Sequence, residues 1–132
     1  MGAAENAALI RRYFEAVGED PRQTAALYAP EAVLHYVARH ALGGAWRGRE
    51  AIQDLFRRSA QAFGGRQRLD LVDVLAGEAR AVAILDGSVA RPQAEACWQR
   101  TVVFALAGGV IEEQWIYDDD PDLLEELLGR PS

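Results

Sequence analysis

The chain has 132 residues, 50% of them apolar and 26% charged, which is typical of one globular domain with its own core. The formal net charge is −6 and the isoelectric point is about 4.9, so the basic surface of a nucleic-acid-binding protein is not expected. The lone Cys97 excludes an intramolecular disulfide and favours a cytoplasmic location. The first residues lack the pattern of a secretory signal, and no apolar run approaches the roughly 20 residues of a membrane span. We therefore expect residues 1–132 to form a single domain that associates with neither nucleic acid nor membrane.

The N-terminal half predicts three helices. Apolar residues over 9–17 recur at intervals of three and four, which is typical of an amphipathic helix. Asp20 and Pro21 then provide an N-cap and a first helical residue for a short helix, "PRQTAALY", which Pro30 is expected to stop. A third helix is predicted over 49–63, where apolar side chains again share one side and a Gly-Gly pair follows.

The remaining segments predict strands. Five stretches have the composition or alternation of strands: 31–38, 67–76, 80–90, 95–106 and 110–117. A glycine-rich loop follows the first of them, and Gly108 with Gly109 predicts a tight hairpin between the last two. Asp120, Pro121 and Gly129 have the order of N-cap, first residue and C-terminal stop of a closing helix. Helices followed by mostly antiparallel strands predict an α+β fold.

This order of elements resembles the nuclear transport factor 2-like superfamily, especially its SnoaL-like and ketosteroid-isomerase-like members. The matching phrases are "LIRRYFEAVGED", "ALYAPEAVLHYV", "GAWRGREAIQDLF" and "QRTVVFALAGGVIEEQWIYDD". The resemblance implies a cone-shaped, curved antiparallel sheet wrapped around three helices (a cystatin-like α+β barrel), with an apolar pocket at its wide end. It also implies that two subunits pair through the outer face of the sheet. Because the superfamily holds isomerases, cyclases, epoxide hydrolases and non-catalytic modules, the site residues must decide the function.

The resemblance to ketosteroid isomerases is incomplete at the residues that carry their chemistry. Tyr13 lies where these enzymes have a donor tyrosine. The position of their base aspartate falls on or next to Tyr36, and their second acidic donor falls near Val102. Neither residue is acidic, so steroid isomerisation of the usual kind is not expected.

For two other reactions catalysed within the superfamily, the sequence also contains only part of the required catalytic residues. Epoxide hydrolases of the limonene type need an Asp-Arg-Asp set, and the last aspartate of that set falls near Ile116, two residues before Asp118. SnoaL-type cyclases use a histidine and an acid–base aspartate, parts that His35 and Asp118 would take. Both interpretations stay open.

Alternation along the last two strands suggests further candidates. The residues expected to share faces are Val110, Glu112, Gln114 and Ile116 in one strand, and Trp98, Arg100, Val102, Phe104 and Leu106 in the other. An arginine is costly to bury alone, so we expect Arg100 either to pair with an acid such as Glu112 or to reach the rim. Such a pair would orient an anionic or carbonyl substrate or let Glu112 act as a base. An ion pair on an exposed face remains an equal alternative.

Both histidines lie close to the first strand, but their spacing fixes no third ligand, so a metal site is not expected. His35 and Tyr36 are adjacent and must point to opposite faces. From the resemblance we expect Tyr36 to face the pocket and His35 to face outward. Trp46 follows on the loop, either as a pocket wall or lid or as a plug against the third helix.

We therefore predict a cofactor-independent cyclase or isomerase that uses acid–base chemistry on a small hydrophobic, carbonyl-bearing molecule, and that forms a homodimer. The alternatives are a non-catalytic dimeric ligand-binding or interaction module and an epoxide-hydrolase-like enzyme. The candidate catalytic residues are Tyr13, His35, Tyr36, Arg100, Glu112 and Asp118. The candidate substrate-binding residues are Trp46, Phe56, Phe63, Trp98, Val102, Gln114 and Ile116.

Overall fold

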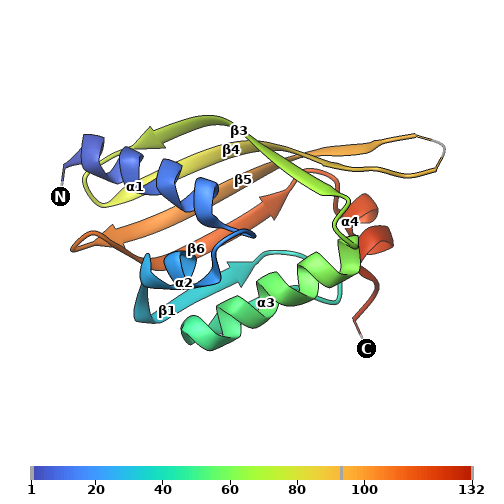
Figure 1. Ribbon diagram of the computed structural model, residues 1–132, viewed down its shortest axis with the longest axis horizontal. Helices are drawn as coiled ribbons and strands as arrows, with labels where there is room; N and C mark the ends of the chain where they lie inside the picture. Colours follow the sequence, from blue (N-terminus) through green and yellow to red (C-terminus); the bar gives the residue numbers. More distant parts are fainter. Residues whose placement is uncertain (1, 93, 132) are drawn as a thin grey trace.

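One curved sheet of six strands carries the structure, and helices lie against one of its faces (Figure 1). The computed structural model describes residues 2–92 and 94–131. Its strands are β1 (Tyr28–Tyr36), β2 (Gly44–Arg47), β3 (Gln67–Ala76), β4 (Arg80–Val89), β5 (Ala96–Ala107) and β6 (Val110–Asp118). They are arranged in the order β2-β1-β6-β5-β4-β3. The predicted α+β class with a curved sheet is confirmed.

The sheet departs from the prediction near its β1 edge. β1 and β6 run parallel, whereas every other neighbouring pair is antiparallel. A parallel pair needs a long connection, and here more than half of the chain lies between the two strands. The glycine-rich segment expected as a loop contains β2, which pairs with the end of β1. Pro30 lies inside β1, where the register with β6 shifts between Tyr28 and Val33 and the ladder needs no N–H from it.

Four helices complete the chain: α1 (Ala3–Ala16), α2 (Pro21–Ala26), α3 (Gly48–Phe63) and α4 (Pro121–Leu128). The predicted caps are confirmed, since the Asp20 side chain accepts a hydrogen bond from Gln23 N and that of Asp120 accepts one from Leu123 N. Gly64 ends α3 in the left-handed region at φ 61°. Within the described ranges, no helix combines the length and apolar character needed to cross a membrane.

The helices leave an open space over the centre of the sheet. α1 packs over β3 and β4, where Asn6 Nδ2 donates to the carbonyl oxygens of Gly77 and Glu78, both at 2.9 Å. α3 packs over β1 and β2 on the other side. Apolar side chains such as Ile10 and Ile52, both fully buried, hold these contacts. The inner faces of β5 and β6 therefore form the floor between the two helices.

A β-bulge decides which side chains of β6 face this floor. Ala105 of β5 pairs with Glu113, but the next residue, Leu106, pairs with Ile111, so Glu112 is an extra residue in β6. The bulge turns Ile111 into the core and leaves Glu112 exposed. The prediction that Glu112 faces the pocket is therefore wrong, because simple alternation does not continue through a bulge.

Candidate functional site

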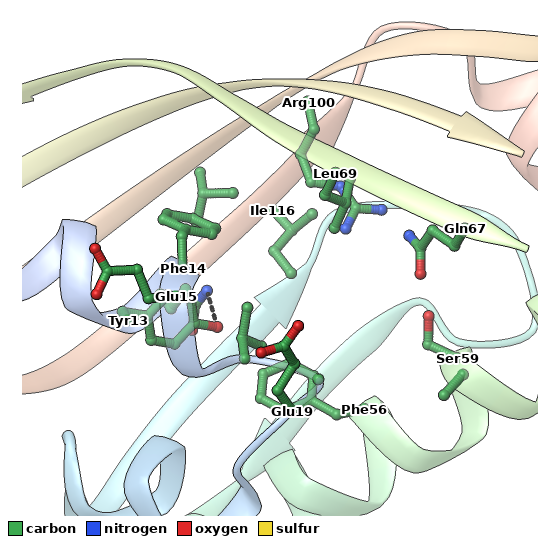
Figure 2. Close-up of a pocket in the computed structure, with 15 residues that line it drawn as sticks. Tyr13, Phe14, Glu15, Glu19, Phe56, Ser59, Gln67, Leu69, Arg100 and Ile116 are labelled. Atoms are coloured by element: carbon green, nitrogen blue, oxygen red, sulfur yellow. Dashed lines mark hydrogen bonds between the residues drawn. The ribbon is translucent and has the colours of Figure 1, made fainter. Parts of the chain in front are cut away.

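A cavity of about 350 Å³ lies between α1, α3 and the inner face of the sheet (Figure 2). This volume is at the lower end of the range for small-molecule sites. Its apolar walls include Phe14, Phe56, Leu69, Val102 and Ile116. Its polar lining residues are Tyr13, Glu15, Glu19, Ser59, Gln67, Arg100 and Gln114. The predicted binding residues Phe56, Val102, Gln114 and Ile116 thus line the cavity.

Arg100 and Asp118 form a buried ion pair at one end of the cavity, from directly opposed positions on β5 and β6. Arg100 Nε donates to Asp118 Oδ1 at 2.7 Å, and Nη2 donates to Oδ2 at 3.3 Å. The Tyr36 hydroxyl donates to Asp118 Oδ2 at 2.6 Å and accepts from Arg100 Nη2 at 2.8 Å. Trp98 Nε1 donates to Asp118 Oδ1 at 2.9 Å. The acid that pairs with Arg100 is therefore Asp118 rather than Glu112.

The electrostatics of this cluster keep Arg100 charged. Its side chain is 9% exposed and that of Asp118 is 4% exposed. Burial alone would lower the pKa of Arg100, but the nearby Tyr36 and Asp118 raise it overall. Desolvation is the main cause that raises the pKa of Tyr36, so its hydroxyl stays protonated. Arg100 is thus a permanent cation whose guanidinium lies over the Tyr36 ring, 5.5 Å from the centroid.

One guanidinium nitrogen of Arg100 remains available to a ligand. Nε and Nη2 are used by Asp118 and Tyr36, whereas Nη1 forms no hydrogen bond with any residue in the described ranges. Figure 2 shows the guanidinium in the cavity between Ile116 and Gln67. The cluster behind Arg100 therefore fixes the side chain and directs its free edge into the cavity.

Trp98 supports the cluster from the neighbouring strand. Its indole stacks on Phe63 with ring centroids 6.1 Å apart, and both side chains are buried without lining the cavity. It also lies directly against Gly87 of β4, where a Cβ atom would come within 2.5 Å of the indole. Only glycine leaves room for the indole here, and Trp98 then reaches Asp118. Phe63 and Trp98 are therefore supporting residues rather than cavity walls.

A second polar cluster on the cavity floor contains Tyr13, Tyr28 and Gln114. Gln114 Nε2 donates to the Tyr13 hydroxyl at 3.2 Å, the bond drawn in Figure 2. The hydroxyl oxygens of Tyr13 and Tyr28 are 2.9 Å apart, and Tyr28 also donates to Gln114 Oε1. All three side chains are at most 2% exposed. Burial is the main cause that raises the pKa of both tyrosines, so both hydroxyls are neutral.

The protons of Tyr13, Tyr28 and Gln114 are not all used in the hydrogen bonds of this cluster. A tyrosine hydroxyl carries one proton. The Tyr28 hydroxyl donates its proton to Gln114 Oε1, because an amide oxygen can only accept. In the hydrogen bond between the two hydroxyls, Tyr13 must therefore be the donor and Tyr28 the acceptor. Tyr13 then has no donor left for a ligand, while Gln114 Nε2 keeps its second proton. The donor role that the resemblance suggests for Tyr13 passes in this arrangement to Gln114.

The histidines lie outside the cavity lining. His35 is on the outer side of the sheet, where its Nε2 lies 2.6 Å from Glu113 Oε2 and its ring stacks on Trp115 at 5.4 Å. Tyr36 is on the inner side, so the two neighbours face opposite sides as alternation predicted, and Tyr36 takes the side expected from the resemblance. His40 is buried edge-to-face with Tyr36, and its Nδ1 accepts from Leu42 N at 3.1 Å. Burial is the main cause that lowers the pKa of His40, which favours a neutral ring.

Trp46 packs the β2 segment against α3 and does not line the cavity. Its Nε1 donates to Leu42 O at 3.0 Å, and the guanidinium of Arg58 in α3 lies 5.8 Å from its ring. Of its two predicted roles, wall or plug, these contacts agree with the plug. The ring is held away from the cavity because β2 is a strand rather than a free loop.

Sequence reasoning missed Tyr28, Glu19, Ser59 and Gln67. Tyr28 was assigned to the end of the second helix, although it begins β1. Ser59 follows Phe56 by three residues on α3 and Gln67 alternates with Leu69 on β3, so both share a face with apolar residues, whereas Glu19 lies on a turn that has no such pattern. Among the described residues no cluster of three or more His, Cys, Asp or Glu side chains is arranged to hold a metal ion. Nor is an Asp-Arg-Asp set assembled there, because Arg100 contacts a single carboxylate, that of Asp118.

Comparisons with known proteins agree with this architecture. The profile of the SnoaL-like domain family matches residues 10–114. Bal32a, from a soil-derived mobile gene cassette, is 25% identical, with a TM-score of 0.87 over 96% of this chain and 98% of that chain. A nuclear transport factor 2-like protein of Burkholderia xenovorans is 16% identical, with a TM-score of 0.77 over 98% and 99% of the two chains. TerC, co-crystallised with polyporic acid, is 16% identical, with a TM-score of 0.79 over 93% and 98%.

A search of curated proteins found no match to the chain. The family profile nevertheless covers all of α2, α3 and β1 to β5, together with the second half of α1 and the first half of β6. It thus includes Tyr13, Arg100 and Gln114 of the cavity, while Asp118 follows just after it. The chain belongs to the SnoaL-like domain family.

Proposed function

We propose that this protein is a cofactor-independent enzyme of the cyclase or isomerase type, acting on a small, hydrophobic, carbonyl-bearing molecule. The observation that carries the proposal is the clamped Arg100, whose unbonded Nη1 faces a cavity with mostly apolar walls. A fixed cation in such a cavity stabilises negative charge more strongly than it would in water. It therefore suits a reaction in which a carbonyl oxygen becomes an enolate.

The two polar clusters support complementary parts of this reaction. Arg100 binds the carbonyl oxygen, and the free proton of Gln114 Nε2 supplies a neutral donor from the neighbouring strand. Asp118 and Tyr36 hold Arg100 in place before the substrate arrives, so no reorganisation is needed when charge develops. The apolar walls favour a hydrophobic substrate because they exclude water. TerC, a structural neighbour, was crystallised with polyporic acid, which is a precedent for an organic acid within this fold.

A non-catalytic ligand-binding module is the second candidate, and one observation favours it. The buried carboxylate of Asp118 receives hydrogen bonds from Arg100, Tyr36 and Trp98, so it is not free to remove a proton. A protein with Arg100 alone would bind a carbonyl or phenolate without converting it. The two candidates therefore differ in proton transfer and not in binding.

The test combines a binding probe with a proton-exchange assay. Naphthol, a fluorescent phenol whose emission changes on ionisation, is titrated into the protein. A panel of cyclic enones and β-diketones is incubated with the protein in deuterium oxide, and exchange beside the carbonyl is followed by NMR. The control is the double variant Arg100→Met/Asp118→Asn, which removes the cation without leaving a lone buried charge. We expect naphtholate binding and deuterium exchange in the wild type and neither in the control.

Each other result points to a different function. Binding that depends on Arg100, without exchange of any compound above the buffer rate, supports the ligand-binding module. Wild-type protein that neither binds naphthol nor accelerates exchange overturns the proposal. Equal binding by wild type and control also overturns it, because the cation would then have no part in recognition.

A further inference from the structure

We infer that Glu19, on the turn between α1 and α2, is the carboxylate that moves protons in this cavity. The inference rests on the proposed function and names the base that the Arg100 cluster lacks. The resemblance places the base of such enzymes on a strand, at or next to Tyr36, yet none of the strand residues that line this cavity is a carboxylate. The candidate comes instead from the mouth of the cavity.

The other polar residues around the cavity are not available as a base. Burial raises the pKa of Tyr13, so its hydroxyl, 2.9 Å from that of Tyr28, stays protonated at neutral pH and is not available as a base. Asp118 does not line the cavity, and its oxygens accept from three side chains. The carboxylates that line the cavity are those of Glu15 and Glu19. Neither forms a hydrogen bond or ion pair with any residue in the described ranges.

The orientation of the two glutamates distinguishes them. Figure 2 shows the Glu19 carboxylate directed toward the side of the cavity where Ile116 lies, whereas the Glu15 carboxylate points away from it. The turn that carries Glu19 is fixed by backbone bonds, since the N–H groups of Glu19 and Asp20 both donate to Ala16 O, at 3.0 and 2.8 Å. Phe56 of α3 contributes an apolar wall to the same cavity. The carboxylate of Glu19, carried on a fixed turn, and the fixed cation of Arg100 thus border the same cavity.

The reaction step balances without any further reagent. Glu19 accepts the proton from the carbon beside the substrate carbonyl, and the C–H electron pair becomes part of a carbon–carbon double bond. The carbonyl π electrons move to oxygen, which becomes an enolate bound by Arg100 Nη1. In an isomerisation, Glu19 returns the proton to another carbon of the same molecule. In a cyclisation, the enolate carbon bonds to a second carbonyl of the substrate, and the resulting alkoxide takes the proton from Glu19.

The experiment uses a probe that needs only a base and an oxyanion site. Nitrobenzisoxazole opens when a base removes its ring C–H proton: a nitrile forms, the N–O bond breaks, and a coloured phenolate is released. The phenolate oxygen is the group that Arg100 would stabilise. Rates are measured for the wild-type chain, Glu19→Gln, Glu19→Asp and the control variant Glu5→Gln, whose exposed glutamate on α1 does not line the cavity. Because both glutamates are exposed, thermal unfolding checks that each variant keeps its fold.

We expect Glu19→Gln to lower kcat for the probe by roughly 100-fold, the lower end of what a positioned general base contributes, with little change in KM. The acidic limb of the pH–rate profile should disappear with it. Glu19→Asp keeps a shorter carboxylate and should retain part of the rate, whereas Glu5→Gln should stay close to wild type. If Glu19 had only a structural role, Glu19→Gln would leave the shape of the pH–rate profile unchanged. It would also not lower kcat selectively while KM stays constant.

Two results overturn the inference and leave the proposed function intact. One is a Glu19→Gln variant with the wild-type rate and pH profile. The other is a wild-type protein that binds naphthol through Arg100 but does not open the probe faster than acetate at the same concentration. If naphthol also fails to bind, the proposed function fails together with the inference.

Discussion

Replacing Asp118 with asparagine isolates the electrostatic contribution of the Arg100 cluster. The substitution keeps the size of the side chain and an acceptor for Trp98, but it removes the charge that compensates Arg100. Arg100 would remain buried with 9% of its side chain exposed and without a counter-ion. Losing one partner of such a pair typically costs about 3–5 kcal/mol of unfolding free energy. Because the asparagine retains some hydrogen bonds, we expect a loss of about 3 kcal/mol.

This loss is large enough to measure by thermal unfolding. For a chain of 132 residues, the unfolding entropy is about 0.28 kcal/mol/K, so a loss of about 3 kcal/mol lowers Tm by roughly 10 °C. Urea unfolding followed by tryptophan fluorescence gives the free energy directly, since Trp98 lies within the cluster. Far-UV circular dichroism on the same samples tests whether the transition is two-state.

The double variant Arg100→Met/Asp118→Asn provides the decisive comparison. If the cost of the single change comes from an uncompensated charge, removing that charge should restore at least about 1 kcal/mol of stability. The single variant would then be less stable than the double variant, which additive contact losses cannot produce. A single variant within about 1 kcal/mol of wild type, or a double variant that is less stable than the single one, would refute the electrostatic account of the cluster.

Three further outcomes follow from the structure. Desolvation is the main cause that lowers the pKa of buried His40, so as pH falls through about 6.5 the unfolded chain binds a proton that the folded state does not. The unfolding free energy should therefore decrease as pH falls over this range. Urea unfolding between about pH 7.5 and 5 should show this decrease, and a less steep one in His40→Asn. Gly87→Ala places a Cβ 2.5 Å from the Trp98 indole, so it should lower the free energy of unfolding by about 1–3 kcal/mol and change the near-UV circular dichroism spectrum. The control Gly77→Ala, whose nearest contact is at 3.7 Å, should show little change in Tm. We also propose a homodimer that pairs through the outer face of the sheet. Light scattering should then give twice the 14.5 kDa chain mass for the wild type and the monomer mass for Trp115→Lys. A wild-type monomer at micromolar concentration would contradict this proposal.

Local signals in the sequence were sufficient for most elements of the fold. The predicted strand 67–76 coincides with β3, and the caps at Asp20 and Asp120 mark the starts of α2 and α4. The hairpin at Gly108 and Gly109 forms as expected, with φ values of 58° and 78°. These features depend on neighbouring residues only, which is why a single sequence predicts them.

Features that depend on distant parts of the chain were not predictable in the same way. The parallel pairing of β1 with β6 joins segments about 80 residues apart, and no local pattern encodes its direction. The bulge at Glu112 is set by pairing with β5, so strict alternation placed that residue on the wrong face. Asp118 shares the inner face with Gln114 and Ile116 because alternation resumes after the bulge. The cluster around Arg100 was therefore anticipated in its chemistry but not in its partner.

The balance between bonded and free polar groups distinguishes the two candidate functions. A binding module needs the apolar walls and the free Nη1 of Arg100, and an unpaired carboxylate at the mouth would only add a desolvation cost for an apolar ligand. The presence of Glu19 there consequently favours proton transfer over binding alone. A ligand with a cationic group would give Glu19 a different use, as a counter-ion at the mouth. In that case Glu19→Gln would weaken binding and leave turnover of the bound molecule unchanged, whereas a base lost from the cavity lowers kcat and leaves KM almost unaltered.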